Sequence, residues 1–514
     1  MKKFFKYLLY IMPLMLYFSY FPVIKLGENE TMYFELSLPL IWLVVFDIVS
    51  LIMVCKKYRK ELFSHVFGSI LWWLFPLFAT ISVAWSLNAT RGFLTAGVMW
   101  ALFFAVIDIY ELRENLDAKF WKVFWRWFFG SALFVCLWCV VQCILDVFGV
   151  SQEVSLLCDG CVYRMFGFPR PNGFAIEPQF MGNLLLAPIF IVATIFCQSS
   201  SRVVVAHRHG DGVLILALPR SVISQIWQKT SGLLLFVFLS TLFLTFSRGA
   251  IYACVVGLVF LTGFLLARAK KTERKSVCFS ILKTLGLFVL AFLFTLNLQG
   301  ILTAVSPTSD TYGDGVAKVL NQLSLGIIDV RGGKKTSSEG SGKPVENFGE
   351  KVENTSAMLA ENSVETESAF DGYVAESTDT RMRLASSAMK VWRQDFKTVM
   401  VGVGMGGAGQ ALYNNGFSPA PREIVQNEYA EILLETGLIG VSLFVVMIVL
   451  VVRVILKNRK AAGMLLALLV AYGVSFCFFS GLPNALHIVL LMGLLVQLSF
   501  AEAAHREVAG LQEI

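Results

Sequence analysis

Amide and acidic side chains crowd together directly before an apolar stretch toward the end of the sequence. Segment 425–440, VQNEYAEILLETGLIG, carries five of them: Gln426, Asn427, Glu428, Glu431 and Glu435. A carboxylate can orient or deprotonate a substrate hydroxyl, and an amide can hydrogen-bond one. Acidic residues also stabilise a first helical turn through the helix dipole. We expect the first three residues to contact a substrate and the two later glutamates to serve the helix alone.

Arginines that could bind an anion lie in three other segments. They are Arg164 and Arg170 in YRMFGFPRPNGFAIEP, Arg248 in LTFSRGAIYA, and Arg381 in TRMRL. Arg248 interrupts a long apolar run, so its guanidinium lies in poorly hydrated surroundings and needs an anionic partner. A guanidinium binds phosphate oxygens through two parallel hydrogen bonds. An arginine at a bilayer surface can also simply reach lipid headgroups, but Arg248 is predicted to bind a lipid phosphate or diphosphate.

The composition identifies the elements that must position these residues as membrane helices. Of the 514 residues, 56% are hydrophobic and 15% are charged, and the mean hydropathy is +0.68. Soluble domains are about a quarter charged. Apolar stretches long enough to cross a hydrocarbon core of roughly 30 Å as helix lie at 4–24, 37–55, 64–86, 92–110, 127–149, 179–197, 231–247, 249–267, 280–300, 432–456, 462–480 and 484–502. The fold class predicted is all-α, a multi-pass integral membrane protein with about twelve transmembrane helices.

The distribution of basic residues predicts how the helices are oriented. Lys and Arg gather in alternate loops, at 56–60, 202–229, 268–275 and 453–460. Short loops rich in these residues face the cytoplasm, so both termini are expected inside the inner (plasma) membrane. The first apolar run has no small-residue cleavage site and is expected to be retained. The net charge of +7 reflects this cytoplasmic belt, so nucleic acid is not an expected partner.

Three regions follow from this topology. Helices one to nine occupy 1–300, one large extracytoplasmic loop covers 301–430, and the last helices with a cytoplasmic tail cover 431–514. Within the loop, residues about 331–378 are rich in Ser, Gly, Glu, Asn and Thr, a composition that predicts disorder. An amphipathic helix is expected at 380–396, where apolar residues recur at helical spacing.

Two further motifs have structural explanations. The glycines of VGVGMGGAG, 401–409, lack the preceding strand of a dinucleotide site, which leaves tight packing or a close approach to phosphate. Cys158 and Cys161 in CDGC are expected outside, as a disulfide or a pair of thiols, because zinc would need two more ligands and no histidine lies nearby. No metal or cofactor is expected.

The order of these motifs resembles the O-antigen ligase and polymerase family. The pieces are SRGA between two apolar stretches, an Arg-led helix in a large outer loop, GVGMGG, and QNEYAEILLETGLIG, with SVAWSLNATRG (82–92) and GFAIEPQFMGNLL (173–185) in support. The resemblance covers most of 80–500. It implies a GT-C-like, metal-independent membrane glycosyltransferase. Such an enzyme moves a glycan, with inversion, from a polyprenyl diphosphate to a hydroxyl of an acceptor glycan or lipid on the outer face.

By the order of motifs, the resemblance assigns the diphosphate to two arginines. Arg248 and Arg381 fall on the family's diphosphate-binding positions. Arg383 is the alternative to Arg381, because either could lead the helix. Arg164 and Arg170 are expected to assist in binding the lipid-linked substrate. Since the diphosphate is already a competent leaving group, these residues would mainly hold the negative charge that develops on it.

On the acceptor side the sequence departs from the family. The ligases begin the motif corresponding to QNEY with a histidine thought to activate the acceptor, and here that position is Gln426. Glutamine cannot act as a base, although it can hydrogen-bond a sugar hydroxyl together with Asn427. Glu177 and Glu428 are the available carboxylates. His487 in GLPNALHIV is the one histidine predicted near the outer face, and it either replaces the missing base or packs against a neighbouring helix.

Other functional classes fit the sequence less well. A transporter or flippase of lipid-linked saccharides would also need about twelve helices and basic residues outside, but it usually carries charged residues within midplane helices and has related halves. Asp and Glu are sparse in the apolar stretches, and no repeat is visible. A membrane scaffold would leave Arg248 without a purpose. The absent histidine favours a polymerase over a ligase.

Overall fold

A computed structural model of the chain describes most of the helical stretches. The described residues are 1–19, 23–29, 32–57, 70–147, 170–175, 177–200, 225–269, 271, 274–305, 311–323, 366–457, 461–480, 488–497 and 499. Four residues singled out in the sequence lie outside them: Arg164, His487, Cys158 and Cys161. So does most of the range 331–378.

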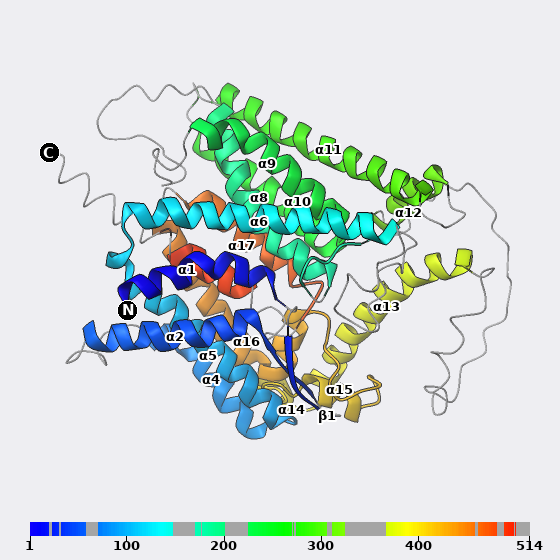
Figure 1. The fold of residues 1–514 in the computed structure, drawn as a ribbon. Helices are drawn as coiled ribbons and strands as arrows, with labels where there is room; N and C mark the ends of the chain where they lie inside the picture. The colour runs from blue at the N-terminus through cyan, green and yellow to red at the C-terminus, as the bar shows by residue number, and fades with distance from the viewer. Residues whose placement is uncertain are drawn as a thin grey trace.

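The described chain is almost entirely helical (Figure 1). The α-helices are α1 (Lys2–Tyr17), α2 (Leu38–Lys57), α4 (Leu74–Ser82), α5 (Ala89–Glu111), α6 (Ala118–Val147), α8 (Pro178–Ser200), α9 (Gln225–Leu244), α10 (Arg248–Arg268), α11 (Arg274–Val305), α12 (Tyr312–Leu323), α13 (Thr366–Trp392), α14 (Phe396–Val401), α15 (Ala408–Asn414), α16 (Glu428–Lys457) and α17 (Ala462–Ser475). A last apolar helix covers Ile488–Gln497. Short 3-10 helices are η1 (Ile70–Trp72), η2 (Val83–Trp85) and η3 (Arg113–Asn115). One antiparallel hairpin, β1 (Val23–Asn29) with β2 (Met32–Ser37), departs from the all-helical expectation.

Fewer helices than expected are long and apolar enough to cross a membrane. Each of the twelve apolar stretches overlaps a helix, but by length and composition seven described helices qualify: α2, α5, α6, α8, α10, α11 and α16. Four shorter apolar helices cover Leu74–Trp85, Thr230–Leu244, Ala462–Ser475 and Ile488–Gln497. The stretch 462–480 shows the reason, because α17 ends at Ser475 and the apolar residues after it leave the helix. An integral membrane protein is thus indicated, and twelve crossings stay a prediction.

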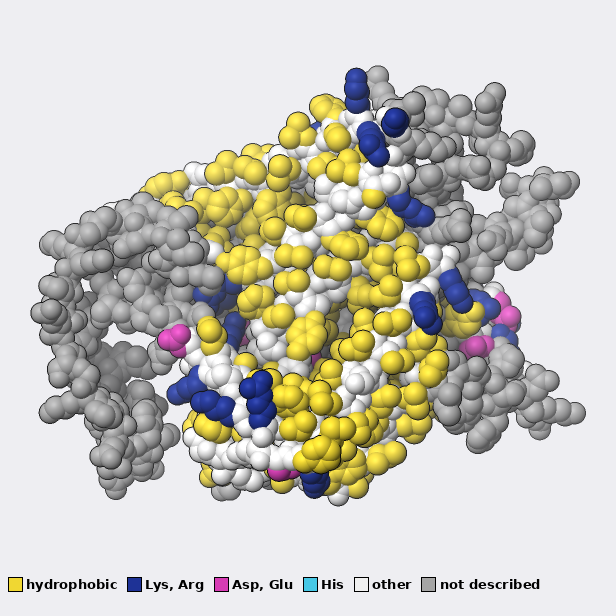
Figure 2. All heavy atoms as spheres, turned by 180° about the vertical axis from the view of Figure 1, so that it is seen from behind, with side chains coloured by type: hydrophobic (Ala, Val, Ile, Leu, Met, Phe, Trp, Pro, Cys, Tyr) yellow, Lys and Arg dark blue, Asp and Glu magenta, His cyan; other side chains and the backbone are white. Residues whose placement is uncertain are grey.

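Helix α8 lies at the centre of the bundle. Within its most apolar window 94% of the residues are buried, compared with 11% in α16 and 17% in α11. Side chains of α1, α6, α9, α10 and α17 join those of α8 in one apolar cluster. Figure 2 shows that the molecule seen from behind is broadly hydrophobic, with basic side chains mostly toward the margins of that surface. Such a surface suits contact with lipid.

The helix expected at 380–396 is present with different bounds. Helix α13 begins at Thr366, inside the range 331–378 that was predicted to be disordered, and ends at Trp392 rather than near 396. It ends earlier because Asp395 caps α14, accepting a hydrogen bond from the Thr398 N–H at 2.8 Å. The buried residues Leu384, Ala388 and Val391 pack α13 against the start of α16.

Candidate functional site

The turn before α10, which we call the basic turn, consists of residues 245–248. Phe246 has a positive φ of 47°, which is unusual for a residue with a side chain. Ser247 then caps the helix, because its side chain accepts a hydrogen bond from the Ala250 N–H. Arg248 is the first helical residue, and its Nη1 atom is buried. The turn therefore holds a guanidinium at a fixed place beside the bundle.

A second arginine reaches the same turn from a distant part of the sequence. Arg170 Nε donates a hydrogen bond to the Thr245 carbonyl at 3.3 Å. From α8, Gln179 accepts a hydrogen bond from the Ser247 hydroxyl. The structure thus brings Arg170 to the turn that leads into Arg248.

The turn into α16, which we call the acidic turn, consists of residues 425–428. Gln426 has a positive φ of 62°. Asn427 caps the helix by accepting a hydrogen bond from the Ala430 N–H at 3.1 Å. Glu428, the first helical residue, is buried. The acidic turn therefore repeats the construction of the basic turn, with the opposite charge on the first helical residue.

Segment 476–480, directly after α17, contacts the acidic turn and the first turn of α10, just after the basic turn. Its Phe476 carbonyl accepts a hydrogen bond from the Glu428 N–H at 3.0 Å. Asn427 Nδ2 donates to the Cys477 carbonyl at 3.3 Å. On the other side, Phe478 packs so closely against α10 that a Cβ added to Gly249 would lie 2.7 Å from the Phe478 Cβ. The two turns are therefore neighbours across a single segment of chain.

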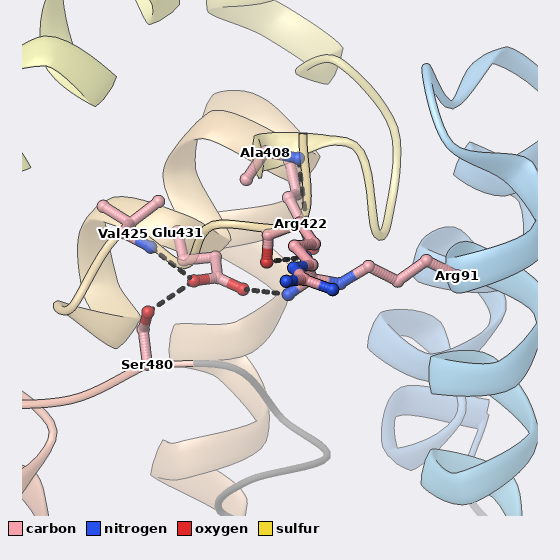
Figure 3. A network of polar contacts seen from close by, with 7 residues as sticks. Arg91, Ala408, Arg422, Val425, Glu431 and Ser480 are labelled. Atoms are coloured by element: carbon pink, nitrogen blue, oxygen red, sulfur yellow. Dashed lines mark hydrogen bonds and ion pairs between the residues drawn. The ribbon is translucent and has the colours of Figure 1, made fainter. Parts of the chain in front are cut away.

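A buried ion pair holds the acidic turn in place (Figure 3). One oxygen of Glu431, Oε1, lies 3.8 Å from Arg91 Nη2. The other, Oε2, accepts hydrogen bonds from the Val425 N–H at 3.2 Å and from the Ser480 hydroxyl. Arg91 Nη1 also donates to the Arg422 carbonyl at 3.4 Å. The prediction that Glu431 serves only the helix dipole is therefore wrong, because a buried carboxylate must find donors and here they come from three separate segments.

Glu435 has a similar structural role one turn further along. It is buried and accepts a hydrogen bond from the Ala408 N–H at 3.3 Å through Oε1. Its backbone packs against the glycine segment, since a Cβ on Gly402 would lie 2.3 Å from the Glu435 carbonyl oxygen. A helix dipole is therefore an incomplete account of this residue too.

The glycines of 402–409 serve tight packing. Gly404, with φ of +89°, lies so close to the segment 82–92 that an added Cβ would lie 2.4 Å from the Ser86 Cα. The same two segments are joined by hydrogen bonds from the Met405 N–H to the Ser82 hydroxyl at 3.0 Å and from the Leu87 N–H to the Val403 carbonyl at 3.3 Å. The segments 82–92 and 402–409, which are far apart in the sequence, thus form one packed unit.

Other residues predicted for the site make no hydrogen bond or ion pair with described residues of the two turns. Arg381 is half-buried and shares the face of α13 that carries Leu384 and Val391, the face packed on α16. Arg383 is exposed, which favours Arg381 of the two. Glu177 is exposed just before α8. Between described residues, no hydrogen bond or ion pair joins any of these three to the basic or acidic turn.

Sequence reasoning missed Arg91 and Ser480. Arg91 lies within the quoted segment 82–92, but nothing in its spacing points to Glu431, 340 positions later in the numbering. Ser480 was counted as part of an apolar stretch. The described residues include no group of three or more His, Cys, Asp or Glu side chains that could hold a metal ion.

Comparison with known proteins supports the family resemblance. Residues 233–445 match the family model of the O-antigen ligase. The match contains the basic turn, α13, the glycine segment and the acidic turn, whereas Arg91, Arg170 and Ser480 lie outside it. No curated protein gives a significant match. Residues 233–445 are therefore similar to the O-antigen ligase family, and this match supports glycan transfer of the ligase or polymerase type.

Proposed function

We propose that the protein is a membrane glycosyltransferase, a glycan polymerase or ligase of surface polysaccharide biosynthesis. It transfers a saccharide from a polyprenyl diphosphate carrier to an acceptor hydroxyl at the outer face of the plasma membrane. The observation that carries the proposal is that segment 476–480 contacts both the acidic turn and Gly249, the residue directly after the basic turn, in a chain whose residues 233–445 match the O-antigen ligase family. Donor and acceptor can then meet across that segment.

On the donor side, the basic turn binds the diphosphate. Arg248 and Arg170 supply two guanidinium groups at one place, and Arg381 is a third candidate from α13. Fixed positive groups that face the leaving oxygen stabilise the charge that develops as the glycosidic bond breaks. In this scheme the arginines carry out the neutralisation that a divalent cation performs elsewhere, so the reaction is metal-independent.

On the acceptor side, the acidic turn binds the attacking hydroxyl. Gln426 and Asn427 can hydrogen-bond sugar hydroxyls, and Glu428 accepts the proton. The acceptor oxygen forms a bond to the anomeric carbon while the bond from that carbon to the diphosphate oxygen breaks. A single displacement of this kind inverts the configuration and requires attack from the face opposite the diphosphate.

An assay without an ion gradient tests the proposal and separates it from lipid-linked saccharide transport. The purified protein in detergent micelles would be given a polyprenyl-diphosphate-linked glycan, and products would be followed by gel electrophoresis and mass spectrometry. We expect new glycosidic bonds and released polyprenyl diphosphate, with a ladder of lengths for a polymerase. Glycan movement across a vesicle membrane with no new glycosidic bond in micelles would overturn the proposal in favour of a flippase.

A further inference from the structure

One glutamine is buried among the apolar residues of α6. Gln142 is 1% exposed and lies between Val141 and Cys143, near the end of that helix. A carboxamide carries two donor hydrogens and an acceptor oxygen, and burying these groups without partners costs free energy. A glutamine at this place therefore requires a specific set of hydrogen bonds.

The side chain of Gln142 binds the segment that carries Arg170. Its Oε1 atom accepts a hydrogen bond from the Gly173 N–H at 2.9 Å, and its Nε2 atom donates to the Gly173 carbonyl at 3.1 Å. Nε2 also donates to Oδ1 of Asn172 at 3.2 Å. The amide thus satisfies both backbone groups of Gly173, as the facing residue of an antiparallel β-ladder does.

Segment 170–175 folds as a tight turn against α6. Nδ2 of Asn172 donates to the Ala175 carbonyl at 2.9 Å, and the Ala175 N–H donates back to the Asn172 carbonyl at 3.0 Å. Gly173 has a φ of 61°, and a Cβ added to it would lie 3.1 Å from Cγ1 of Val135 on α6. The turn therefore depends on a glycine, which lets the backbone approach the helix.

Arg170 is attached stiffly to the start of this turn. Only Pro171 separates it from Asn172. Proline fixes its own φ at about −65° and confines the preceding residue to extended conformations, so little freedom remains between the turn and Arg170. Nε of Arg170 donates to the Thr245 carbonyl of the basic turn at 3.3 Å. The direction of the Arg170 guanidinium therefore depends on how Gln142 orients the turn.

Packing and orientation of segment 170–175 rest on different contacts. The ring of Phe174 stacks on that of Trp138 in α6, with centroids 5.5 Å apart and planes inclined by 7°. Apolar contact of this kind is non-directional, whereas a hydrogen bond weakens steeply when it is bent. The stacked rings can therefore keep the turn on α6, while the amide of Gln142 sets its orientation.

We propose that Gln142 is a positioning residue that holds the Arg170 guanidinium at the basic turn, where it binds the diphosphate of the donor. This inference rests on the proposed function, because it concerns how one arginine of that site is held. Gln142 acts through Gly173 and Asn172, to which its amide is hydrogen-bonded.

Binding of undecaprenyl diphosphate to the full chain in lipid nanodiscs tests this role without relying on turnover. Gln142→Leu nearly keeps the size of the side chain and removes its hydrogen bonds. The dissociation constant should rise about tenfold, as expected for the loss of one hydrogen bond to a charged group. In a chain with Arg170→Gln, which has already lost that contact, adding Gln142→Leu should change the dissociation constant by less than about twofold. Gln142→Asn, whose amide is one methylene shorter, repeats the cycle if Gln142→Leu fails to accumulate.

Trp138→Leu is the matched control, because it removes the ring that stacks on Phe174 and leaves the amide of Gln142 in place. It should lower the unfolding temperature, while the dissociation constant stays within about twofold of that of the natural chain. An equal loss of binding in Trp138→Leu and Gln142→Leu would mean that any loosening of the turn displaces Arg170. The particular role of Gln142 would then be wrong.

The remaining outcomes separate this inference from the proposed function. If Gln142→Leu weakens binding as much in the Arg170→Gln chain as in the natural chain, Gln142 does not act through Arg170 and the proposal is overturned. Absence of binding by the natural chain overturns it as well. Binding that depends on Gln142 and Arg170 as expected, in a protein that forms no glycosidic bond, would count against the proposed function while the positioning role stands. A protein that forms glycosidic bonds and binds equally well after Gln142→Leu would keep the proposed function and lose this inference.

Discussion

The basic and acidic turns share one construction. The second residue of each turn, Phe246 or Gln426, has a positive φ, and these are the only two non-glycine residues of that kind in the described part of the chain. Each continues with a polar side chain that caps the following helix, Ser247 or Asn427. A non-glycine residue in this conformation costs about 1–3 kcal/mol and persists where the surroundings hold it. Both turns are therefore places where the fold accepts a local cost.

The two turns differ in the charge of the first helical residue. This difference shows which of the two charges helps to stabilise its helix and which does not. A helix begins at the positive end of its dipole, which favours Glu428 and disfavours Arg248, each by about 0.3–1 kcal/mol. Glu428 thus has a structural reason to stand where it does, as the sequence already suggested. The helix dipole gives Arg248 no such reason, and the anionic ligand proposed above would provide one.

Substitution of Arg248 should have the largest effect. Arg248→Lys keeps the charge but loses the two parallel hydrogen bonds of a guanidinium. Transfer should fall about a hundredfold if about 3 kcal/mol of transition-state stabilisation is lost, and Arg248→Ala should be at least as damaging. The measurement is glycan transfer in membranes at matched protein level.

Arg268 provides the matched control at the other end of α10. It lies 5.3 Å over the Phe264 ring, near the negative end of the helix dipole, so Arg268→Lys should leave transfer within about twofold. Near-normal transfer by Arg248→Lys would mean that Arg248 is only an anchor at the lipid surface, and the basic turn would lose its assigned role.

The Arg91–Glu431 pair should give the next largest effect. In Arg91→Gln the buried Glu431 carboxylate keeps its charge and loses its countercharge, which costs about 3 kcal/mol when a buried pair is broken from one side. In the double variant Arg91→Gln with Glu431→Gln, the amide oxygen can still accept from Val425 and Ser480, and no charge remains. We expect the double variant to unfold at a higher temperature than Arg91→Gln alone and to recover part of the lost transfer.

If the ion pair holds the acidic turn, the effects of substituting Arg91 and Glu431 must be coupled. If the effects of Arg91→Gln and Glu431→Gln simply add in thermal unfolding and in transfer, the two side chains act independently. In that case the ion pair would not be what holds the acidic turn. Exposed Lys6 with Asp117, which pair at 2.7 Å, offers a control cycle in which little coupling is expected.

Local patterns predicted the helices and the packing role of the glycines, but not how the helices end. Apolar stretches located a helix each time. They could not show that α17 ends at Ser475, because residues 476–480 are as apolar as a helix and leave it to contact α10 and α16. Similarly, the polar composition before residue 380 predicted disorder where the first turns of α13 lie.

The sequence predicted two charged residues of the candidate site but not the residues that bond to their turns. Charged residues beside apolar stretches marked Arg248 and Glu428, since such positions are costly without a reason. The partners that hold them could not be found from spacing. Arg170 reaches Thr245, and Arg91 reaches Glu431, only because the helices fold back on one another. Long-range pairs of this kind leave no periodic signal.

Substitutions of Gln426 should have mild effects on transfer. They should also distinguish the role of its backbone conformation from that of its side chain. Gln426→Gly adopts the positive φ without cost, so unfolding temperature should hold or rise while the acceptor KM rises a few-fold, roughly 1 kcal/mol for a lost hydrogen bond. Gln426→His restores the ligase-like residue and should keep transfer within about threefold. A β-branched Gln426→Val should lower the unfolding temperature, because that side chain clashes at positive φ. Equal unfolding temperatures for Gly and Val would show that the turn carries no strain.

Asp395 should give the smallest effect, because it caps a helix that belongs to neither turn. Its backbone is extended, with φ of −149°, and its side chain accepts from the Thr398 N–H and hydroxyl at 2.8 and 2.7 Å. The Thr398 N–H, followed by its hydroxyl, holds the pKa of Asp395 below its ordinary value of 3.8. A lowered pKa means that the ionised Asp395 stabilises the fold at pH values above 3.8. This contribution is lost as the pH falls through the pKa of the folded state.

Asp395→Ala should therefore lower the unfolding temperature slightly at neutral pH and leave glycan transfer unchanged. In acid, its unfolding temperature should approach that of the natural chain. Asp395→Asn caps the helix without a charge, so its unfolding temperature should depend less on pH than that of the natural chain. Glycan transfer would be compared at equal amounts of folded protein. A loss of transfer in Asp395→Ala would mean that a helix start without a positive φ also matters for activity. The special role given to the basic and acidic turns would then be wrong.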